Sequence, residues 1–467
     1  MARKLIQSTF LAFGYCALLI FSITLPSQLI FWGGLGCFVL LAIFFLNDPF
    51  KILLLIISLI PLEYLGSIEI GSVTIRLSQI LTLFLFISLA FNWLASGKKI
   101  GLNWSIFSWF VLFLAAGIFS LLFAENFTRG ISVWLFIVFS FAFGYFVSAI
   151  VNSEEKLKKA VKVILFAAAV FALFGLYQFI GSYLGWPTGL RSAYQIGVFA
   201  FPRIQSTFLE PLYFANFLIV PVSVLFLGYV AEGRLNKTRV IILFLLILAL
   251  LLTFSRGGYL GVGAAFIVGV VLLFVFRLTP KKRIFGKIFG ACLGVLGIVV
   301  LLGSFSNINL ETFVERAQDV TVTSADTGRL DNFQRAFTFF QASPIHGVGV
   351  GNYGVVAGGY SKEWGWGIVN NEYLEVLAET GLVGFIPFAI FLLAIFIRGF
   401  RVIRIAKDNQ ARLLQVCLLA GLAGILVQYL TFSTLYIMHI WLFIGLTIAS
   451  QNIINAQATQ LSKQTND

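Results

Sequence analysis

The stretch "NNEYLEVLAETGLVGF", residues 370–385, begins with two amides and three carboxylates and ends in apolar residues. The carboxylates are spaced three and four residues apart, which places them on one face of an α-helix. One of the two asparagines is expected to cap that helix. An ionisable residue at the edge of the apolar layer of a membrane marks a functional cavity. A well-capped helix that dips a polar face into water is the plainer alternative.

Composition classifies the chain as a membrane protein. Of its 467 residues, 60% are hydrophobic and 11% are charged, and apolar runs long enough to cross a bilayer recur along the sequence. The predicted fold class is all-α: a polytopic integral membrane helix bundle of about 12–14 transmembrane helices with one large extracytoplasmic loop containing amphipathic helices. Individual spans are expected at, among others, 8–25, 52–65, 288–303 and 378–397.

The chain is expected to divide into four parts. They are an N-terminal transmembrane bundle of about eleven spans at residues 1–303, an extracytoplasmic loop domain at 304–372, a C-terminal part of about three spans at 373–455 and a polar cytoplasmic tail at 456–467.

The distribution of charge predicts the orientation. The net charge is +13, and most lysines and arginines lie in short connections on one side of the predicted spans, so that side and both termini are expected to be cytoplasmic. These residues face anionic lipid head groups, and nucleic acid is therefore not an expected partner. The basic residues left on the outer side are almost all arginine. The four cysteines share no short spacing, so neither a metal site nor a disulfide framework is indicated.

The large outer loop contains "GRLDNFQRAFTFFQA", in which apolar residues recur at spacings of three, four and three. This pattern predicts an amphipathic helix that carries Arg329 and Arg335. Asp326 and Thr327 offer N-cap oxygens, and Pro344 is expected to stop the helix.

A glycine-rich stretch, "HGVGVGNYG", follows this helix. It predicts a tight extramembrane turn, because no strand precedes it in a nucleotide-binding arrangement. The chain has only two histidines. His346, in this turn, is expected to be solvated, and His439, about one turn into the last span, is expected to be a buried hydrogen-bonding partner; direct base chemistry is the alternative for each.

Two further stretches place arginine at the outer ends of spans. In "LLLTFSRGGYLGVG", Arg256 lies at a short turn and is followed by two glycines that permit close approach of a ligand; an arginine that merely snorkels is the alternative. In "FPRIQSTFLEPLYFANFL", Arg203 and Glu210 bracket the start of a span, with Pro211 in its first turn. An Arg203–Glu210 ion pair is the structural alternative there. Asn216, further along, is expected to bond a neighbouring helix.

Several arginines from separate outer segments suit one kind of ligand. Guanidinium groups bind phosphate oxygens in a bidentate manner, and several are needed to hold a diphosphate. A lipid-linked diphosphate at the outer leaflet therefore fits the set Arg203, Arg256, Arg329 and Arg335.

The order of "RIQSTFLEP", "TFSRGGYLG", "GRLDNFQRAF...SPIHGVGVGNYG" and "NNEYLEVLAETGLVGF" resembles the bacterial O-antigen ligase and O-antigen polymerase superfamily of polytopic membrane glycosyltransferases, over roughly residues 200–450. The resemblance implies transfer of a glycan from an undecaprenyl diphosphate carrier to a glycan acceptor at the extracytoplasmic face of the bacterial inner (plasma) membrane, without a metal or other cofactor. The implied partners are the undecaprenyl-diphosphate-linked donor, the acceptor and the lipid bilayer, and a chain-length regulator is left open.

The resemblance also implies residue roles. Arg256 in "SRGG" and Arg329 in "GRL" match arginines thought to engage the diphosphate. Where family members usually carry histidine before the Glu-x-Gly, this chain has Asn370, and a neutral amide cannot accept the proton of an attacking sugar hydroxyl. A ligase is therefore disfavoured, and a polymerase of O-antigen-like or exopolysaccharide repeat units is preferred.

In this interpretation Glu372 or Glu210 supplies the base and Asn370 orients the acceptor hydroxyl. The acceptor cavity is lined by Asn371, Glu375 and Glu379. The nearest alternative is an O-antigen ligase that transfers the glycan to a lipid A core or another acceptor. From another class, a polysaccharide or lipid transporter or flippase would predict repeated halves and charges near the bilayer midplane.

Overall fold

The computed structural model of the chain describes residues 19, 23, 27–63, 67–70, 73–97, 104–195, 201–233, 236–278, 324–361 and 365–464. The predicted span at 288–303 and nearly all of the one at 8–25 lie outside these ranges.

The elements before the large loop are α2 (Ser27–Phe44), α3 (Pro49–Leu59), β1 (Ser67–Ile70), β2 (Val73–Arg76), α4 (Leu77–Ser96), α5 (Trp104–Leu121), α6 (Phe127–Ile150), α7 (Glu154–Leu184), η1 (Ser192–Tyr194), α8 (Pro211–Glu232), α9 (Lys237–Leu252) and α10 (Arg256–Val275). The later elements are α13 (Ser324–Ala342), α14 (Tyr353–Val356), β3 (Tyr360–Ser361), β4 (Gly365–Trp366), α15 (Glu372–Ile405), α16 (Asn409–Gln428), η3 (Tyr429–Thr431) and α17 (Met438–Gln464).

The predicted polytopic helix bundle is confirmed. Within the described ranges, seven helices are long and apolar enough to cross a membrane: α4, α6, α7, α8, α10, α15 and α16. Large apolar side chains such as Ile267 and Val271 of α10 remain exposed, as expected where a helix faces lipid. The predicted span at 52–65 is wrong as a full crossing, because α3 has only 11 residues and a helix needs about 20 to cross. Two small antiparallel hairpins, β1–β2 and β3–β4, were not predicted.

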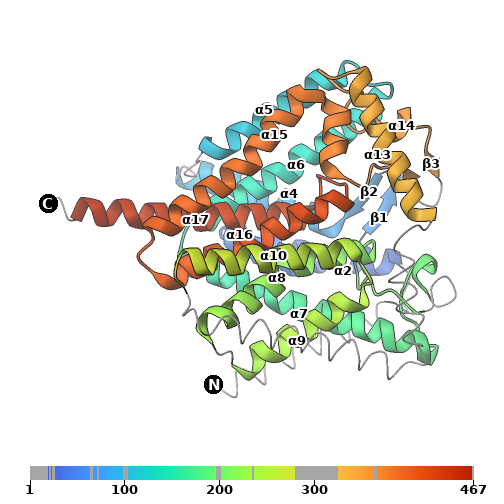
Figure 1. Cartoon of the computed structure of the whole chain (residues 1–467). Coiled ribbons are helices and arrows are strands. Elements are labelled where there is room, and N and C mark those ends of the chain that lie inside the picture. Colours follow the sequence, from blue (N-terminus) through green and yellow to red (C-terminus); the bar gives the residue numbers. More distant parts are fainter. Residues whose placement is uncertain are drawn as a thin grey trace.

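Helices α16 and α17 lie between two groups of helices (Figure 1). On one side α16 packs against α8 and α10, and on the other side α17 packs against α6 and α15, which in turn contacts α5. Glycines allow the close approach of α10 and α16, because a methyl group added at Gly424 would collide with the carbonyl oxygen of Gly261.

The helix that begins with the quoted stretch is broken. Gly381 has φ 60° and ψ −163°, so the predicted span at about 378–397 begins only after a kink that separates Glu372–Thr380 from the rest of α15. The backbone of Pro344 and Ile345 fills the break: the amides of Leu382 and Val383 donate to their carbonyl oxygens at 2.9 and 3.3 Å. A side chain at position 381 would collide with this backbone.

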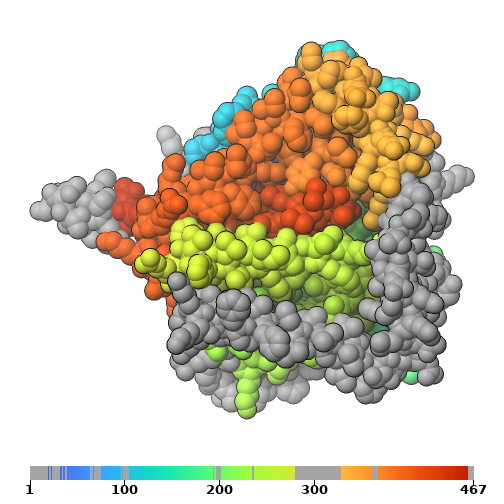
Figure 2. Space-filling view, viewed as in Figure 1, coloured from blue at the N-terminus to red at the C-terminus, as the bar shows by residue number. Residues whose placement is uncertain are grey.

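The loop helix α13 ends at Ala342, directly before Ser343-Pro344 as predicted, and packs against α15 (Figure 2). Its predicted start is wrong. The helix begins at Ser324, before Asp326 and Thr327 in the sequence. Helix α17 continues to Gln464, so residues 456–464 of the predicted polar tail are helical.

The break in α15 predicts the effect of Gly381→Ala. Only glycine adopts this backbone conformation readily, so we expect a loss of about 2 kcal/mol in the free energy of unfolding, seen as a lower unfolding temperature in detergent. Gly263→Ala in α10 is the matched control, because its new methyl group meets no atom within 4 Å and alanine favours a helix. Equal unfolding temperatures for the two variants would contradict the assignment.

Candidate functional site

The first half of α15 is held by bonds from its polar side chains to backbone amides. Asn371 is the N-cap, and its Oδ1 accepts from the amide of Leu374 at 3.1 Å, which confirms the predicted cap. Asn370, at the position of the family histidine, is half-buried with φ 59°, a left-handed conformation that asparagine tolerates.

Glu379 fixes the glycine-rich turn. Its Oε2 accepts from the amide of Gly351 at 2.8 Å and its Oε1 accepts from the amide of Tyr353 at 3.0 Å. In return, the amide of Gly349 donates to the backbone carbonyl of Glu379 at 3.0 Å, as does the hydroxyl of Ser120 at 2.5 Å. The turn therefore caps the carbonyl end of the broken helix, and both carboxylate oxygens of Glu379 accept from backbone amides.

Glu372 ties α15 to the segment between α16 and α17. Its amide donates to the carbonyl of Phe432 at 3.1 Å, and its buried carboxylate accepts from the amide of Thr434 at 2.6 Å. Glu375 instead accepts from the amide of Val369 at 2.9 Å. All three glutamates of the quoted stretch thus hold backbone segments in place.

Arg129, on α6, completes this frame, although the sequence pattern marked it only as one of the outer arginines. Its Nε donates to the carbonyl of Gly351 at 2.6 Å, and its guanidinium lies 5.0 Å from the ring centroid of Trp366. It also acts electrostatically on Glu375 and Glu379.

A second group of charges gathers at the N-terminal ends of α8 and α10. Arg203 donates from Nε to the carbonyl of Thr253 and from an Nη to that of Phe254, both at 3.2 Å. Burial lowers the pKa of Arg203, while Tyr194, among other groups, raises it. Arg203 therefore shapes the turn from which α10 begins.

Arg256 is the first residue of α10 and is exposed. Ser255 precedes it as the N-cap, with its hydroxyl accepting from the amide of Gly258 at 3.3 Å. The structure brings Arg256 within electrostatic reach of Arg203. Two of the four predicted diphosphate-binding arginines therefore lie together.

Glu210 lies beside these arginines as the N-cap residue of α8, directly before Pro211, as predicted. Burial raises the pKa of the Glu210 carboxyl, whereas Arg191 and Arg203 lower it. An Nη of Arg191 also donates to the carbonyl of Leu209 at 3.5 Å. Arg191 was not singled out from the sequence, since nothing in its surroundings there separates it from other loop arginines.

The other two predicted arginines lie on α13. Arg335 is exposed and Arg329 is half-buried. Arg335 acts electrostatically on Tyr353, the pKa of which burial raises to about 12. The strongest electrostatic neighbours of Arg203 are instead groups on or next to α8 and α10 and in the turn around Tyr194. Of the four predicted arginines, Arg203 and Arg256 interact electrostatically with each other. The roles of Arg329 and Arg335 stay predictions.

The two histidines differ from each other in their surroundings. The ring of His346 stacks on that of Phe123 with centroids 3.6 Å apart, so it is less solvated than expected. His439 is fully buried, and its Nε2 lies 2.9 Å from Oδ1 of Asn216, which confirms both as hydrogen-bonding partners between helices. In the ranges that the structure describes, no group of three or more histidine, cysteine, aspartate or glutamate side chains could hold a metal ion.

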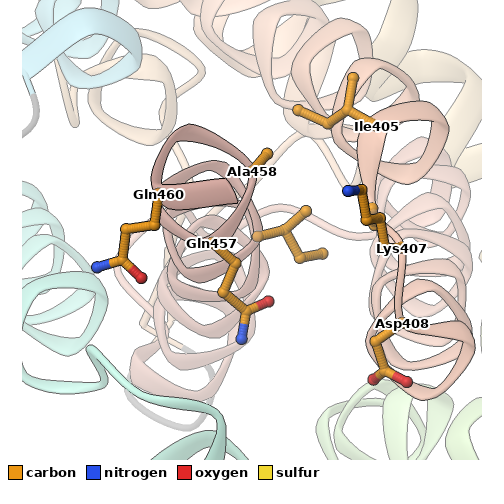
Figure 3. Close-up of a pocket in the computed structure, with 8 residues that line it drawn as sticks. Ile405, Lys407, Asp408, Gln457, Ala458 and Gln460 are labelled. Carbon is orange, nitrogen blue, oxygen red and sulfur yellow. The ribbon is translucent and has the colours of Figure 1, made fainter. Parts of the chain in front are cut away.

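A cavity of about 310 Å³ lies at the other end of α15 from these groups (Figure 3). Lys407 and Asp408 lie on one side of it and Gln457 of α17 on the other. None of the predicted site residues lines it, so we do not place the chemistry there.

Comparison with known proteins agrees with this arrangement. A family model described as O-antigen ligase matches residues 241–389, the segment that contains Arg256, Arg329 and the carboxylates of α15. This segment of the chain is therefore similar to the O-antigen ligase family, whose members are ligase-like or polymerase-like membrane glycosyltransferases. No curated protein matches the chain.

The two bonds to Glu379 predict that Glu379→Gln destabilises the fold. A glutamine presents one oxygen and one N–H donor, so either Gly351 or Tyr353 would lose its acceptor, at a cost of about 1–3 kcal/mol in the free energy of unfolding. Glu375→Gln is the control, because the amide oxygen can still accept from Val369. Thermal unfolding in detergent should rank Glu379→Gln clearly below the control, and the reverse order would contradict this role.

Proposed function

We propose that the protein is a polymerase that joins undecaprenyl-diphosphate-linked repeat units of an O-antigen-like or exopolysaccharide at the outer face of the bacterial inner membrane. The observation that carries the proposal is that Arg191 and Arg203 act on Glu210 at the start of α8, while Arg256 at the start of α10 acts on Arg203. The resemblance and the matched family model supply the class of substrate.

The arginines suit a diphosphate leaving group. Arg256 is exposed at the start of α10, where the positive end of the helix dipole also favours an anion. Arg203 is half-buried and already donates to two carbonyls, so in this proposal it positions the turn and adds positive charge. Arg256 contacts the phosphate oxygens. Arg329 and Arg335 on α13 remain further candidates for the lipid-linked diphosphate.

Glu210 is the better candidate for the base. An acceptor hydroxyl oxygen attacks the anomeric carbon of the donor sugar, the bond to the diphosphate oxygen breaks, and the hydroxyl proton passes to the carboxylate. Burial raises the pKa of Glu210, which strengthens it as a base. Glu372 is less suitable because its carboxylate is buried against the amide of Thr434. Asn370 is retained as a group that orients the acceptor.

The alternatives differ mainly in the acceptor. The match to an O-antigen ligase family model favours a ligase, in which case the glycan would pass to a lipid A core or another acceptor. The missing histidine at position 370 favours a polymerase. A transporter or flippase is the alternative from another class. It would be favoured if the purified protein transferred no glycan to any acceptor tested. Cytoplasmic termini and a chain-length regulator as a partner remain part of the proposal.

The first test is reconstitution of the purified protein with polyprenyl-diphosphate-linked repeat units, with glycan length followed on a gel. Native protein should give a ladder, and Arg256→Ala should reduce the rate roughly 10²–10³-fold. Arg256→Lys should recover only part of this loss, because lysine lacks the bidentate fork. Arg401→Ala is the control, because Arg401 lies near the C-terminal end of α15, away from the carboxylates at its start. A full ladder from Arg256→Ala would exclude the proposed role of this arginine.

The pKa of Glu210 predicts the pH dependence. The base acts as a carboxylate, so activity is lost as the pH falls through the raised pKa of Glu210. Arg191 lowers that pKa; Arg191→Ala should therefore raise it and move the acidic limb of the rate profile towards neutral pH. Glu210→Gln should remove the limb together with about 10²–10⁴-fold of the rate. An unmoved limb in Arg191→Ala would assign the base to another residue.

A further inference from the structure

A small cavity with polar groups in its lining lies next to the segment that carries the proposed base. Its volume is about 70 Å³, enough for two or three water molecules. Four chain segments enclose it: the end of α3, the start of α4, the start of α8 and the link before α17. Its lining residues are Ile60, Glu63, Arg76, Ser78, Leu209, Tyr213, Thr434, Tyr436, Ile437 and Met438. We call it the Glu63 cavity.

The Glu63 cavity contains both kinds of hydrogen-bonding group. Glu63 offers carboxylate oxygens with only 10% of its side chain exposed, and Arg76 offers guanidinium donors. The Nε of Arg76 is buried without a hydrogen-bond partner among the described residues. Buried donors are almost always satisfied in folded proteins. A molecule that accepts from Arg76 and donates to Glu63 would satisfy both.

Glu63 is held in place from two sides. Its backbone amide donates to the carbonyl of Thr207 at 3.1 Å, and the hydroxyl of Thr207 donates to the carbonyl of Pro61 at 2.6 Å. The "RIQST" stretch thus fixes the segment that carries the carboxylate. On the other side, Oε1 of Glu63 lies 3.6 Å from Nδ1 of His439.

A chain of buried amides sets the orientation of that histidine. Gln428 donates from Nε2 to the carbonyl of Leu212 at 3.1 Å, so its Oε1 accepts from Nδ2 of Asn216 at 2.9 Å. Oδ1 of Asn216 must then accept from Nε2 of His439. This leaves Nδ1 of a neutral His439 as an acceptor that faces Glu63, and the described residues give that atom no hydrogen-bond partner. The Glu63 carboxylate and Nδ1 of His439 are then both acceptors. A hydrogen bond between them requires an added proton or a bridging hydroxyl group.

The Glu63 cavity adjoins both candidate carboxylates of the transfer reaction. Leu209 and Tyr213, on either side of Glu210, line it, and the Tyr213 phenol lies within the electrostatic reach of Glu210 and Glu63. Glu372 holds the opposite wall through the amide of Thr434. Glu210 thus interacts electrostatically with Arg191 and Arg203 and lies in sequence between two residues that line the Glu63 cavity.

We propose that the Glu63 cavity is the subsite for one hydroxyl-bearing edge of the acceptor sugar, in which Glu63 and Arg76 hydrogen-bond adjacent hydroxyl groups and Tyr213 and Tyr436 flank that edge. This assignment rests on the proposed transfer reaction. A sugar hydroxyl donates to a carboxylate and accepts from a guanidinium at the same time, whereas the Glu63 carboxylate repels a diphosphate. The small volume admits one hydroxyl-bearing edge of the sugar. His439 acts as a positioning residue for Glu63.

The test uses binding rather than turnover. The probe is the free repeat-unit oligosaccharide released from the surface polysaccharide of the host bacterium, and the readout is the rise in unfolding temperature of the full-length protein in detergent. Native protein should be stabilised, and Glu63→Gln should require roughly tenfold more oligosaccharide for the same shift, because a charge-assisted hydrogen bond is lost. Glu232→Gln, at the far end of α8, is the matched control and should behave like native protein.

A second variant guards against a folding defect. Ser78→Val narrows the cavity and removes one hydroxyl without touching the charged groups, and it should weaken oligosaccharide binding in the same direction. Unchanged binding in both Glu63→Gln and Ser78→Val, or no binding by native protein, would overturn the subsite; in the second case the cavity holds water only. Arg256→Ala should keep oligosaccharide binding and lose elongation, so failure of the transfer reaction and failure of the subsite give different results.

Discussion

The hydrogen bonds from the amides of Gly351 and Tyr353 to the Glu379 carboxylate join the glycine-rich segment to the first half of α15. The arrangement of the loop around α15 depends on this contact. A kinked helix exposes carbonyl groups at the end of its first half and amides at the start of its second half, and in an apolar layer each must find a partner. The chain meets this demand with its own loop. The turn at 347–351 donates hydrogen bonds to the exposed carbonyl groups, and the backbone at 344–345 accepts hydrogen bonds from the exposed amides. The two backbones approach closely at Gly381 because it has no side chain.

This arrangement explains why a helix bound for a membrane begins with so many carboxylates. Each glutamate of the first half binds the backbone amide of a different segment, so together they fasten the loop, the α16–α17 link and α15 around one point. Carboxylates are strong acceptors for backbone amides, and Arg129 balances part of their charge. Glu210, the base in our proposal, differs from these glutamates because its side chain makes no capping bond to the backbone.

The pattern of the sequence was sufficient for the class of fold and for several local features. Runs of apolar residues require helices in a bilayer because no other open structure satisfies its backbone there. The cap at Asn371, the start of α8 after Glu210 and the stop at Pro344 depend on neighbours in sequence. The start of α13 and the end of α17 were missed, because helix ends depend on weak propensities that packing overrides. The length of α3 was overpredicted for a related reason. Hydropathy does not distinguish a helix that crosses the membrane from a short apolar segment buried in the protein.

The sequence by itself determined that the protein is a helical membrane protein with arginines and carboxylates at one end of its spans, since these properties follow from composition and spacing. Only the tertiary structure decided which charges meet. It placed Arg203 with Arg256 and Glu210, assigned Glu379 to the frame, and brought Glu63 to within 3.6 Å of His439 from the other end of the chain. Pairings of this kind depend on helix packing across hundreds of residues, for which spacing along the chain carries no signal.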